Sequence, residues 1–170
     1  MRQGEKSSAE PAIATTTAIP IPALGTVRAA ASRKRTLLGH EKDEFPIALA
    51  RHGRALEVFE HSGSVLGTVF AYLREKRGLD LTHSQHDEVA SAITRARGSS
   101  FFILGEEHLR FFDELTDAGA APDELAAFFD AFNQARNGRE VGDAMKEGIQ
   151  FLQRALEGVT PGTVVLVAIL

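Results

Sequence analysis

The amino-acid sequence predicts an all-α protein, a bundle of five or six amphipathic helices over residues 44–158. The first observation behind this prediction is a rhythm of glycines, which recur from Gly78 to Gly158 at intervals of 19 to 21 residues. Glycine just past a helix end adopts the left-handed conformation without steric cost. Basic residues before it interact favourably with the negative, C-terminal end of the helix dipole. The second observation is that apolar residues recur between these glycines at helical spacing. Each glycine of the rhythm is therefore expected to end a helix.

Residues 1–43 are expected to form a disordered basic arm that precedes the bundle. The segment is rich in Ala, Thr and Ser, and its prolines interrupt helices. It carries seven Lys/Arg against four Asp/Glu, whereas residues 44–170 carry twelve against nineteen. We interpret its cluster Arg33-Lys34-Arg35 as a solvated run of charge, with contact to an anionic partner as the alternative. The acidic remainder disfavours nucleic acid as a partner, because that binding depends on neutralising phosphates.

Proline and apolar spacing define the first segments of the bundle. Pro46 suits the first turn of a helix, so a helix is favoured over residues 46–62. A hairpin is the alternative, because residues 56–60 partly alternate between apolar and polar. The next helix carries one apolar stripe over residues 65–73 and is expected to end at Gly78.

Capping signals and spacing place the later helices. Thr82 and Gln85 match a capping box, which predicts a helix that ends at Gly98. Pro122, followed by two acidic residues, marks another helix start. Over residues 141–159 the apolar positions are spaced by threes and fours, as in a heptad repeat. This last helix is expected to lie centrally among its neighbours or against a partner.

Residues 159–170 are expected to form an extended apolar tail. After a turn at residues 160–162, residues 163–170 are uncharged and rich in β-branched side chains, which is typical of a buried strand. Few partner strands are evident: the short apolar run 101–104, or residues 56–59 if the hairpin forms. Three interpretations stay open: a plug packed on the bundle, a strand paired within the chain or in a homodimer, or a docking or export tail bound by another protein.

Two helix starts carry the candidate chemistry. His83 and His86 are three positions apart and share a helix face, so they could hold one metal ion together with a carboxylate. Glu106, Glu107 and His108 open a second helix, where a carboxylate beside an imidazole suits acid–base catalysis. The candidate metal ligands are His83, His86, Glu106 and His108. The two histidines and the three residues of the second helix start also fit a structural interpretation. Acidic residues stabilise the positive end of a helix dipole, and His108 lies near an apolar face.

Known catalytic and cofactor motifs are absent from the sequence. It contains no HExxH, no Gly-x-Ser-x-Gly elbow, no P-loop and no dinucleotide-binding fingerprint. With no cysteine, it has no disulfide, thiolate metal site or cysteine nucleophile. No catalytic residue and no cofactor is therefore predicted, and the sequence favours a protein that is not an enzyme. The alternative is an enzyme or a ligand- or metal-binding protein that uses the His and Glu residues at the two helix starts.

Three pairs of adjacent phenylalanines, beginning at positions 101, 111 and 128, favour protein–protein interaction. The pairs fit a Phe-rich core, but a pair between helices also offers a ring to a partner. We interpret the protein as an adaptor, chaperone, immunity or regulatory protein that binds another protein, or a second copy of itself, through a Phe-rich helical face. The candidate partner-binding residues are Phe101, Phe102, Phe111, Val165, Val167 and Ile169.

The predicted location is cytoplasmic. No stretch reaches the roughly 20 apolar residues that a membrane helix needs, and the first residues lack the apolar core of a signal peptide. The absence of cysteine fits a reducing compartment without deciding it. The alternative is secretion without a signal peptide, in which the disordered arm of an exported effector serves as the leader.

Overall fold

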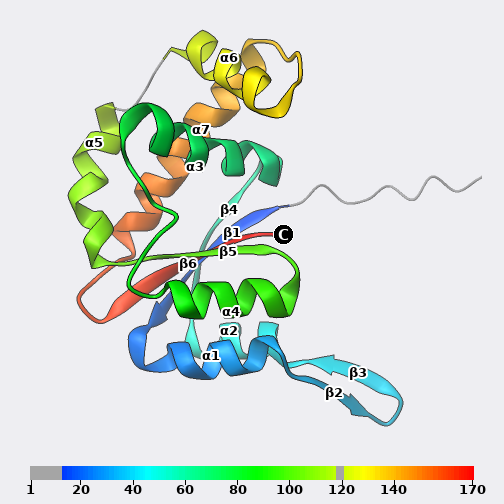
Figure 1. Cartoon of the computed structure of the whole chain (residues 1–170). Coiled ribbons are helices and arrows are strands. Elements are labelled where there is room, and N and C mark those ends of the chain that lie inside the picture. The colour runs from blue at the N-terminus through cyan, green and yellow to red at the C-terminus, as the bar shows by residue number, and fades with distance from the viewer. Residues whose placement is uncertain (1–12, 118–120) are drawn as a thin grey trace, which may run out of the picture.

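The computed structural model describes residues 13–117 and 121–170. Within these residues the chain forms seven α-helices and a four-stranded antiparallel sheet, with a separate two-stranded hairpin (Figure 1). The fold is therefore mixed α/β, and the all-α prediction is wrong. No helix in the described ranges combines the length and the hydrophobicity that crossing a membrane requires.

Strands and helices alternate irregularly along the chain. The strands are β1 (Ala14–Pro20), β2 (Lys34–Leu37), β3 (His40–Asp43), β4 (Arg54–Phe59), β5 (Ser100–Leu104) and β6 (Thr163–Ile169). The α-helices are α1 (Leu24–Ala31), α2 (Glu44–His52), α3 (Gly63–Arg77), α4 (Asp87–Arg97), α5 (Phe112–Asp117), α6 (Pro122–Asn133) and α7 (Arg139–Glu157). Two short 3₁₀ helices, η1 (Ile21–Ala23) and η2 (Glu106–Phe111), precede α1 and α5.

The sheet has the strand order β4-β1-β6-β5, and each neighbouring pair is antiparallel. The predicted apolar tail is therefore the inner strand β6, paired with two neighbours. On one side Ile169 pairs with Ala14, and on the other Leu166 pairs with Ile103. Of the three interpretations of this segment, pairing within the chain is the one that the structure adopts.

Helices cover both faces of the sheet (Figure 1). Val165 and Val167 of β6 face a hydrophobic cluster built with α3, α5, α6 and α7. The alternate residues Val164, Leu166 and Ala168 face a second cluster built with α1, α2 and α4. A strand that is buried on both faces needs apolar side chains at every position, which explains the uninterrupted apolar run of β6.

The segment predicted as a disordered arm is largely folded. Residues 14–43 form β1, η1, α1 and the β2–β3 hairpin. Leu38 (φ 52°) and Gly39 (φ 81°) make the turn of that hairpin in the left-handed region. The predicted disorder of residues 1–12 lies outside the described residues. The β-branched residues 15–17 favour a strand, whereas the nearby prolines, on which the prediction of disorder was based, disfavour only a helix.

The helix favoured over residues 46–62 is correct only in its first half. Helix α2 ends at His52, and Arg54–Phe59 form strand β4 at the edge of the sheet. Gly53 joins the two elements, and a Cβ added there would approach the carbonyl oxygen of Leu49 to 2.8 Å. The partial alternation of apolar and polar residues in this segment was therefore the signal of a strand.

The glycine rhythm marks helix ends at only some of its positions. Gly78 and Gly98 cap α3 and α4 in the left-handed conformation, as predicted. Gly158 follows α7 in a right-handed conformation, and Gly138 instead precedes α7 as its N-cap. Gly119 lies outside the described residues.

An ion pair joins the base of the β2–β3 hairpin to α4. Asp43 caps α2 by accepting a hydrogen bond from the backbone N–H of Phe45 (3.1 Å). The guanidinium of Arg97 donates to both oxygens of the same carboxylate, one of them at 2.8 Å, and lies 4.8 Å from the centre of the Phe45 ring. The hydrogen bonds from Arg97 hold the pKa of Asp43 below its ordinary value, although burial opposes this shift.

The packing of α6 on α7 depends on Gly142. A Cβ on this residue would overlap the carbonyl oxygen of Pro122. Gly142→Ala is therefore expected to push α6 away and to lower the free energy of unfolding by about 2 kcal/mol or more, even after the gain in helix propensity. Gly67→Ala in α3, where the added methyl group meets open space, should raise it by about 0.5–1 kcal/mol. Urea unfolding of both variants tests this, and equal effects would contradict it.

The Asp43–Arg97 ion pair makes stability depend on pH. Because the folded-state pKa of Asp43 lies below 3.8, its carboxylate contributes stability that is complete at higher pH and lost as the pH falls through the folded pKa. Asp43→Asn keeps an oxygen for the helix cap and removes the charge, so we expect a loss of about 1 kcal/mol at neutral pH. The difference from wild type should shrink below about pH 4. Urea unfolding of wild type and Asp43→Asn at pH values above and below 4 measures this difference in free energy, with Glu60→Gln as the exposed control. A difference that does not change with pH would contradict the prediction.

Candidate functional site

The structure brings the two predicted helix starts together. The loop before α4 lies against the start of η2, and two hydrogen bonds connect them. The backbone N–H of Gln85 donates to Oε1 of Glu107 (2.8 Å), and Nε2 of His108 donates to the carbonyl oxygen of His83 (2.7 Å). The candidate residues thus share one neighbourhood, although the two segments are some 20 residues apart in the sequence.

His108 connects two loops through their backbones. Its side chain is buried, with 1% of its surface exposed. Its Nδ1 accepts a hydrogen bond from the backbone N–H of Gly105 (3.0 Å), while its Nε2 donates to His83. Since both ring nitrogens bind backbone groups, no lone pair is left for a metal ion or for a substrate proton. The neighbouring Glu106 is exposed to solvent.

The histidines before α4 have different surroundings. His83 is exposed and its Nδ1 lies 2.8 Å from Asp80. The other oxygen of Asp80 accepts from the backbone N–H of Thr82 (2.9 Å), so this carboxylate closes the turn after α3. The capping box predicted at Thr82 does not form: α4 begins at Asp87, with His86 as its N-cap. The hydroxyl of Thr82, which the motif required as a cap, donates instead to the carboxylate of Asp80 two positions earlier (2.6 Å).

Glu107 is a partly buried acid of this neighbourhood with a lowered pKa. Burial raises its pKa, but hydrogen bonds from the backbone N–H groups of Gln85 and Glu107, with His108 and His86 nearby, bring the pKa below its ordinary value. Its Oε2 and the Nε2 of His86 are buried without a hydrogen-bond partner. No three His, Asp or Glu side chains of the described residues are arranged to hold a metal ion, so the predicted ligands do not form a metal centre.

Half of the predicted partner-binding residues lie in the core. Phe101 is 4% exposed, and Val165 and Val167 are completely buried in the sheet. Phe102 is partly buried, with its ring centre 4.7 Å from that of Phe70. Phe111 and Ile169 are also partly buried against the first cluster. The folded chain therefore offers Phe101, Val165 and Val167 to no partner.

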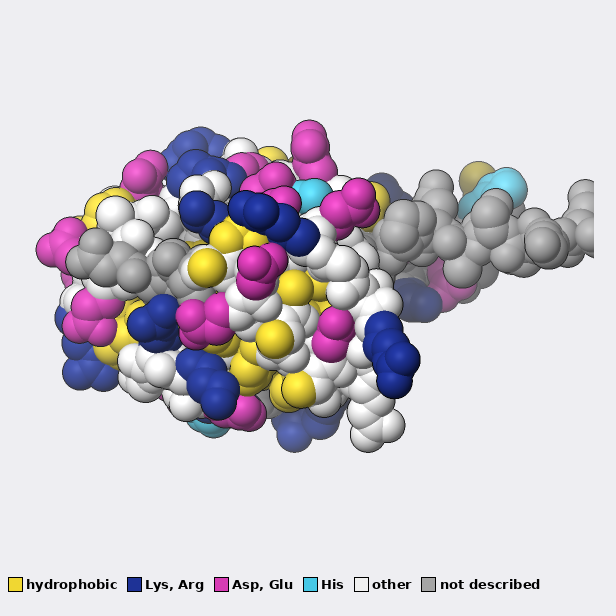
Figure 2. Space-filling view, turned by 90° about the horizontal axis from the view of Figure 1, so that it is seen from above, with side chains coloured by type: hydrophobic (Ala, Val, Ile, Leu, Met, Phe, Trp, Pro, Cys, Tyr) yellow, Lys and Arg dark blue, Asp and Glu magenta, His cyan; other side chains and the backbone are white. Residues whose placement is uncertain are grey.

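The exposed aromatic surface lies on α6 instead. One side of this helix, with Leu125, Ala126 and Phe129, is buried against its neighbours. Beyond the first turn, which carries Asp123 and Glu124, the solvent-facing part of the helix is largely apolar, and we name it the α6 outer face; its residues are Ala127, Phe128, Ala131 and Phe132. Phe132 is 50% exposed. Figure 2 views this end of the molecule, where hydrophobic side chains reach the surface among charges of both signs.

A ladder of three rings supports this face. Tyr72 of α3 is buried, and its ring meets Phe128 edge-on at 5.2 Å. Phe128 in turn stacks on Phe132 at 5.8 Å, with an angle of 15° between the rings. The Tyr72 hydroxyl donates to Glu124 and accepts from Arg77, each at 3.2 Å, while burial raises its pKa. The exposed ring is therefore held in place from the core outward.

None of the partner-binding residues predicted from the sequence belongs to the α6 outer face. The sequence did contain a signal, because residues 125–132 include a single charged residue, Asp130. A surface helix with so few polar side chains over two turns leaves apolar side chains in contact with water.

Comparison with known proteins gives no further guidance. No protein-family model, no curated protein and no solved structure matches this chain. The function must be argued from the residues of the chain itself.

His108 should matter for stability and not for metal binding. His108→Leu leaves the N–H of Gly105 and the carbonyl of His83 without partners, so we expect the free energy of unfolding to fall by about 2–4 kcal/mol. His83→Ala, at an exposed position, should cost less than about 1 kcal/mol. Chemical unfolding of wild type and both variants, with EDTA or with added zinc, measures these changes in stability. A rise in stability with zinc that is lost in His108→Leu would contradict the structural role.

Proposed function

We propose that this protein is a protein-interaction module that binds an amphipathic helix of another protein along the α6 outer face. The observation that carries the proposal is Phe132, a half-exposed ring that lies near the exposed Ala127 and Ala131 on a helix whose other side is buried. Solvated helices of globular proteins normally turn a polar side to water. An ordered aromatic side chain at such a position is typical of an anchor for a partner.

The energetics of this face favour binding. Covering the exposed half of the Phe132 ring removes roughly 100 Å² from water, which contributes about 2.5 kcal/mol. The stack on Phe128 already restricts the ring, so little conformational entropy is lost when a partner covers it. The small side chains of Ala127 and Ala131 lie beside the rings and let a second helix approach closely.

Charges at the two ends of α6 define the expected partner. The exposed Asp123 lies at its start, and the exposed Arg136 and Arg139 follow its end. A complementary helix carries an apolar stripe, basic residues near Asp123 and acidic residues near the two arginines. This arrangement selects the orientation of the partner helix as well as its composition.

The alternative functions have less support. In the enzyme hypothesis, both ring nitrogens of His108 are occupied by backbone groups, and Glu107 accepts a hydrogen bond from the backbone of Gln85. His83 lies against Asp80, and no three His, Asp or Glu side chains of the described residues are arranged to hold a metal ion. The exported-effector hypothesis depends on a disordered leader, and residues 14–43 of that segment are folded. The proposal keeps the class of function inferred from the sequence, protein–protein interaction, but places the binding surface on α6 in place of residues 101, 102, 111, 165, 167 and 169.

The test replaces the exposed ring by a charge. Phe132→Glu should abolish capture of a partner protein from a lysate of the source organism, because the charge would be buried in the interface. Val58→Glu is the matched control: Val58 is 54% exposed but lies on β4, so the same partner should be captured as by wild type. Both variants should unfold within about 1 kcal/mol of wild type, since both sites are surface positions.

Three outcomes would overturn the proposal. One is equal capture of the partner by Phe132→Glu and wild type. Another is loss of capture in Val58→Glu as well. The third is a wild-type dimer in sedimentation velocity that Phe132→Glu converts to a monomer, since a second copy would then occupy the face.

A further inference from the structure

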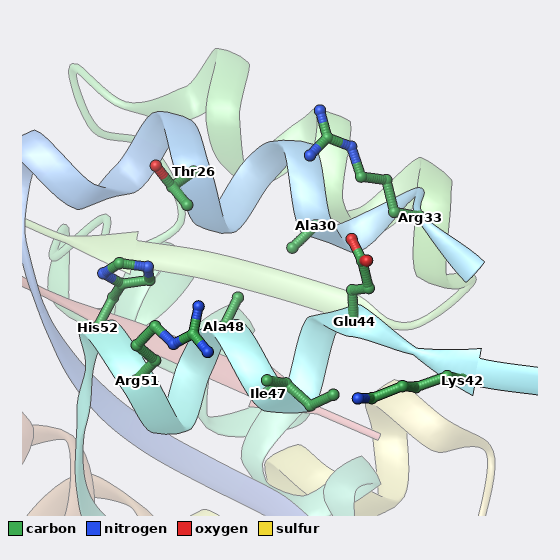
Figure 3. Close-up of a pocket in the computed structure, with 9 residues that line it drawn as sticks. All are labelled: Thr26, Ala30, Arg33, Lys42, Glu44, Ile47, Ala48, Arg51 and His52. Atoms are coloured by element: carbon green, nitrogen blue, oxygen red, sulfur yellow. The ribbon is translucent and has the colours of Figure 1, made fainter. Parts of the chain in front are cut away.

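A groove between α1 and α2 collects basic side chains. Its volume is about 390 Å³, and it lies on the side of the sheet opposite to α6 (Figure 1). Ala30 of α1 and Ala48 of α2 face each other across it (Figure 3). Because both side chains are small and buried, the two helices leave space between them.

The rim of the groove is cationic. Arg33, Lys42, Arg51 and His52 line it, with Glu44 as the acidic member among the described lining residues. In Figure 3, Lys42 and Arg51 lie at opposite ends of the α2 side of the groove. Arg33 lies on the α1 side, next to Glu44 at the start of α2. None of the four basic side chains takes part in a hydrogen bond or an ion pair with the described part of the chain.

This concentration of positive charge contrasts with the rest of the molecule. The whole chain carries a net charge of −4, yet the permanent charges of the groove are three cations and one anion. Three cations against one anion on the rim of a single groove give it a net positive potential. An anionic ligand would be attracted by that potential.

The lining also determines the kind of anion. Arginine guanidinium groups bind phosphate oxygens in pairs of hydrogen bonds, and the Thr26 hydroxyl offers another donor. Ile47, which is 38% exposed, and Ala48 provide an apolar surface for an organic group. The volume falls within the range of small-molecule sites and is too small for a folded partner.

We propose that the groove between α1 and α2 binds a phosphate monoester. Arg33, Lys42 and Arg51 hold the phosphate, and the organic group rests on Ile47 and Ala48. The fold supports this arrangement, because the Asp43–Arg97 ion pair fixes the start of α2 and the strand that carries Lys42. The site is separate from the α6 outer face, so either proposal can fail without the other.

The experiment measures binding of two probes, inorganic phosphate and phenyl phosphate, by isothermal titration calorimetry at constant ionic strength. Both should bind saturably, with phenyl phosphate at least about threefold tighter because its ring covers Ile47. Arg51→Gln should weaken both by about tenfold, and Arg33→Gln combined with Arg51→Gln should abolish binding. Arg95→Gln on α4 removes the same charge away from the groove and should leave the affinities unchanged.

Each contrary result would overturn the proposal. Binding that does not saturate, or that weakens equally in Arg95→Gln, would reduce the effect to general attraction of anions. Equal affinity for the two probes would refute the organic half of the ligand. All substituted residues are solvent-exposed, so the unfolding midpoints of the variants should match wild type and confirm that a lost signal is lost binding.

Discussion

The pairing of β6 with β1 and β5 holds the two helical layers of this protein together. Val165 and Val167 belong to the cluster under α3 and α7, while Val164, Leu166 and Ala168 belong to the cluster above α1 and α4. Each cluster therefore uses the same strand as its wall. The α6 outer face and the basic groove lie in different layers, and both depend on this strand for their support.

Local patterns in the sequence identified those elements whose stabilising contacts are themselves local. Helix α7 follows from the spacing of its apolar residues, and α3 and α4 end at Gly78 and Gly98 because a left-handed residue is needed there. The strand character of residues 163–170 was also evident. One of its two partners, the run 101–104, was also among the candidates and is confirmed as β5. The sequence did not show the other partner, residues 14–20, because pairing across such a separation leaves no local trace.

The candidate site could be predicted only in part for a related reason. The position of His108 near an apolar face was evident from helical spacing, but its role depends on a carbonyl 25 residues away. The α6 outer face could have been predicted from the sequence, because the scarcity of polar residues over positions 125–132 is a local property. The basic groove could not be predicted, since Arg33 and Arg51 line one groove only when α1 packs against α2.

The long separation between β1 and β6 also governs how the chain folds. The paired residues are 143 to 155 positions apart, so β1 can meet its central partner only after almost all of the domain has left the ribosome. Until then β1 can pair with β4, which is much closer to it in the sequence. Non-local pairing of this kind makes folding slow and leaves an apolar strand edge open in the meantime. Nascent chains of this protein therefore have a longer need for chaperones than their size alone implies.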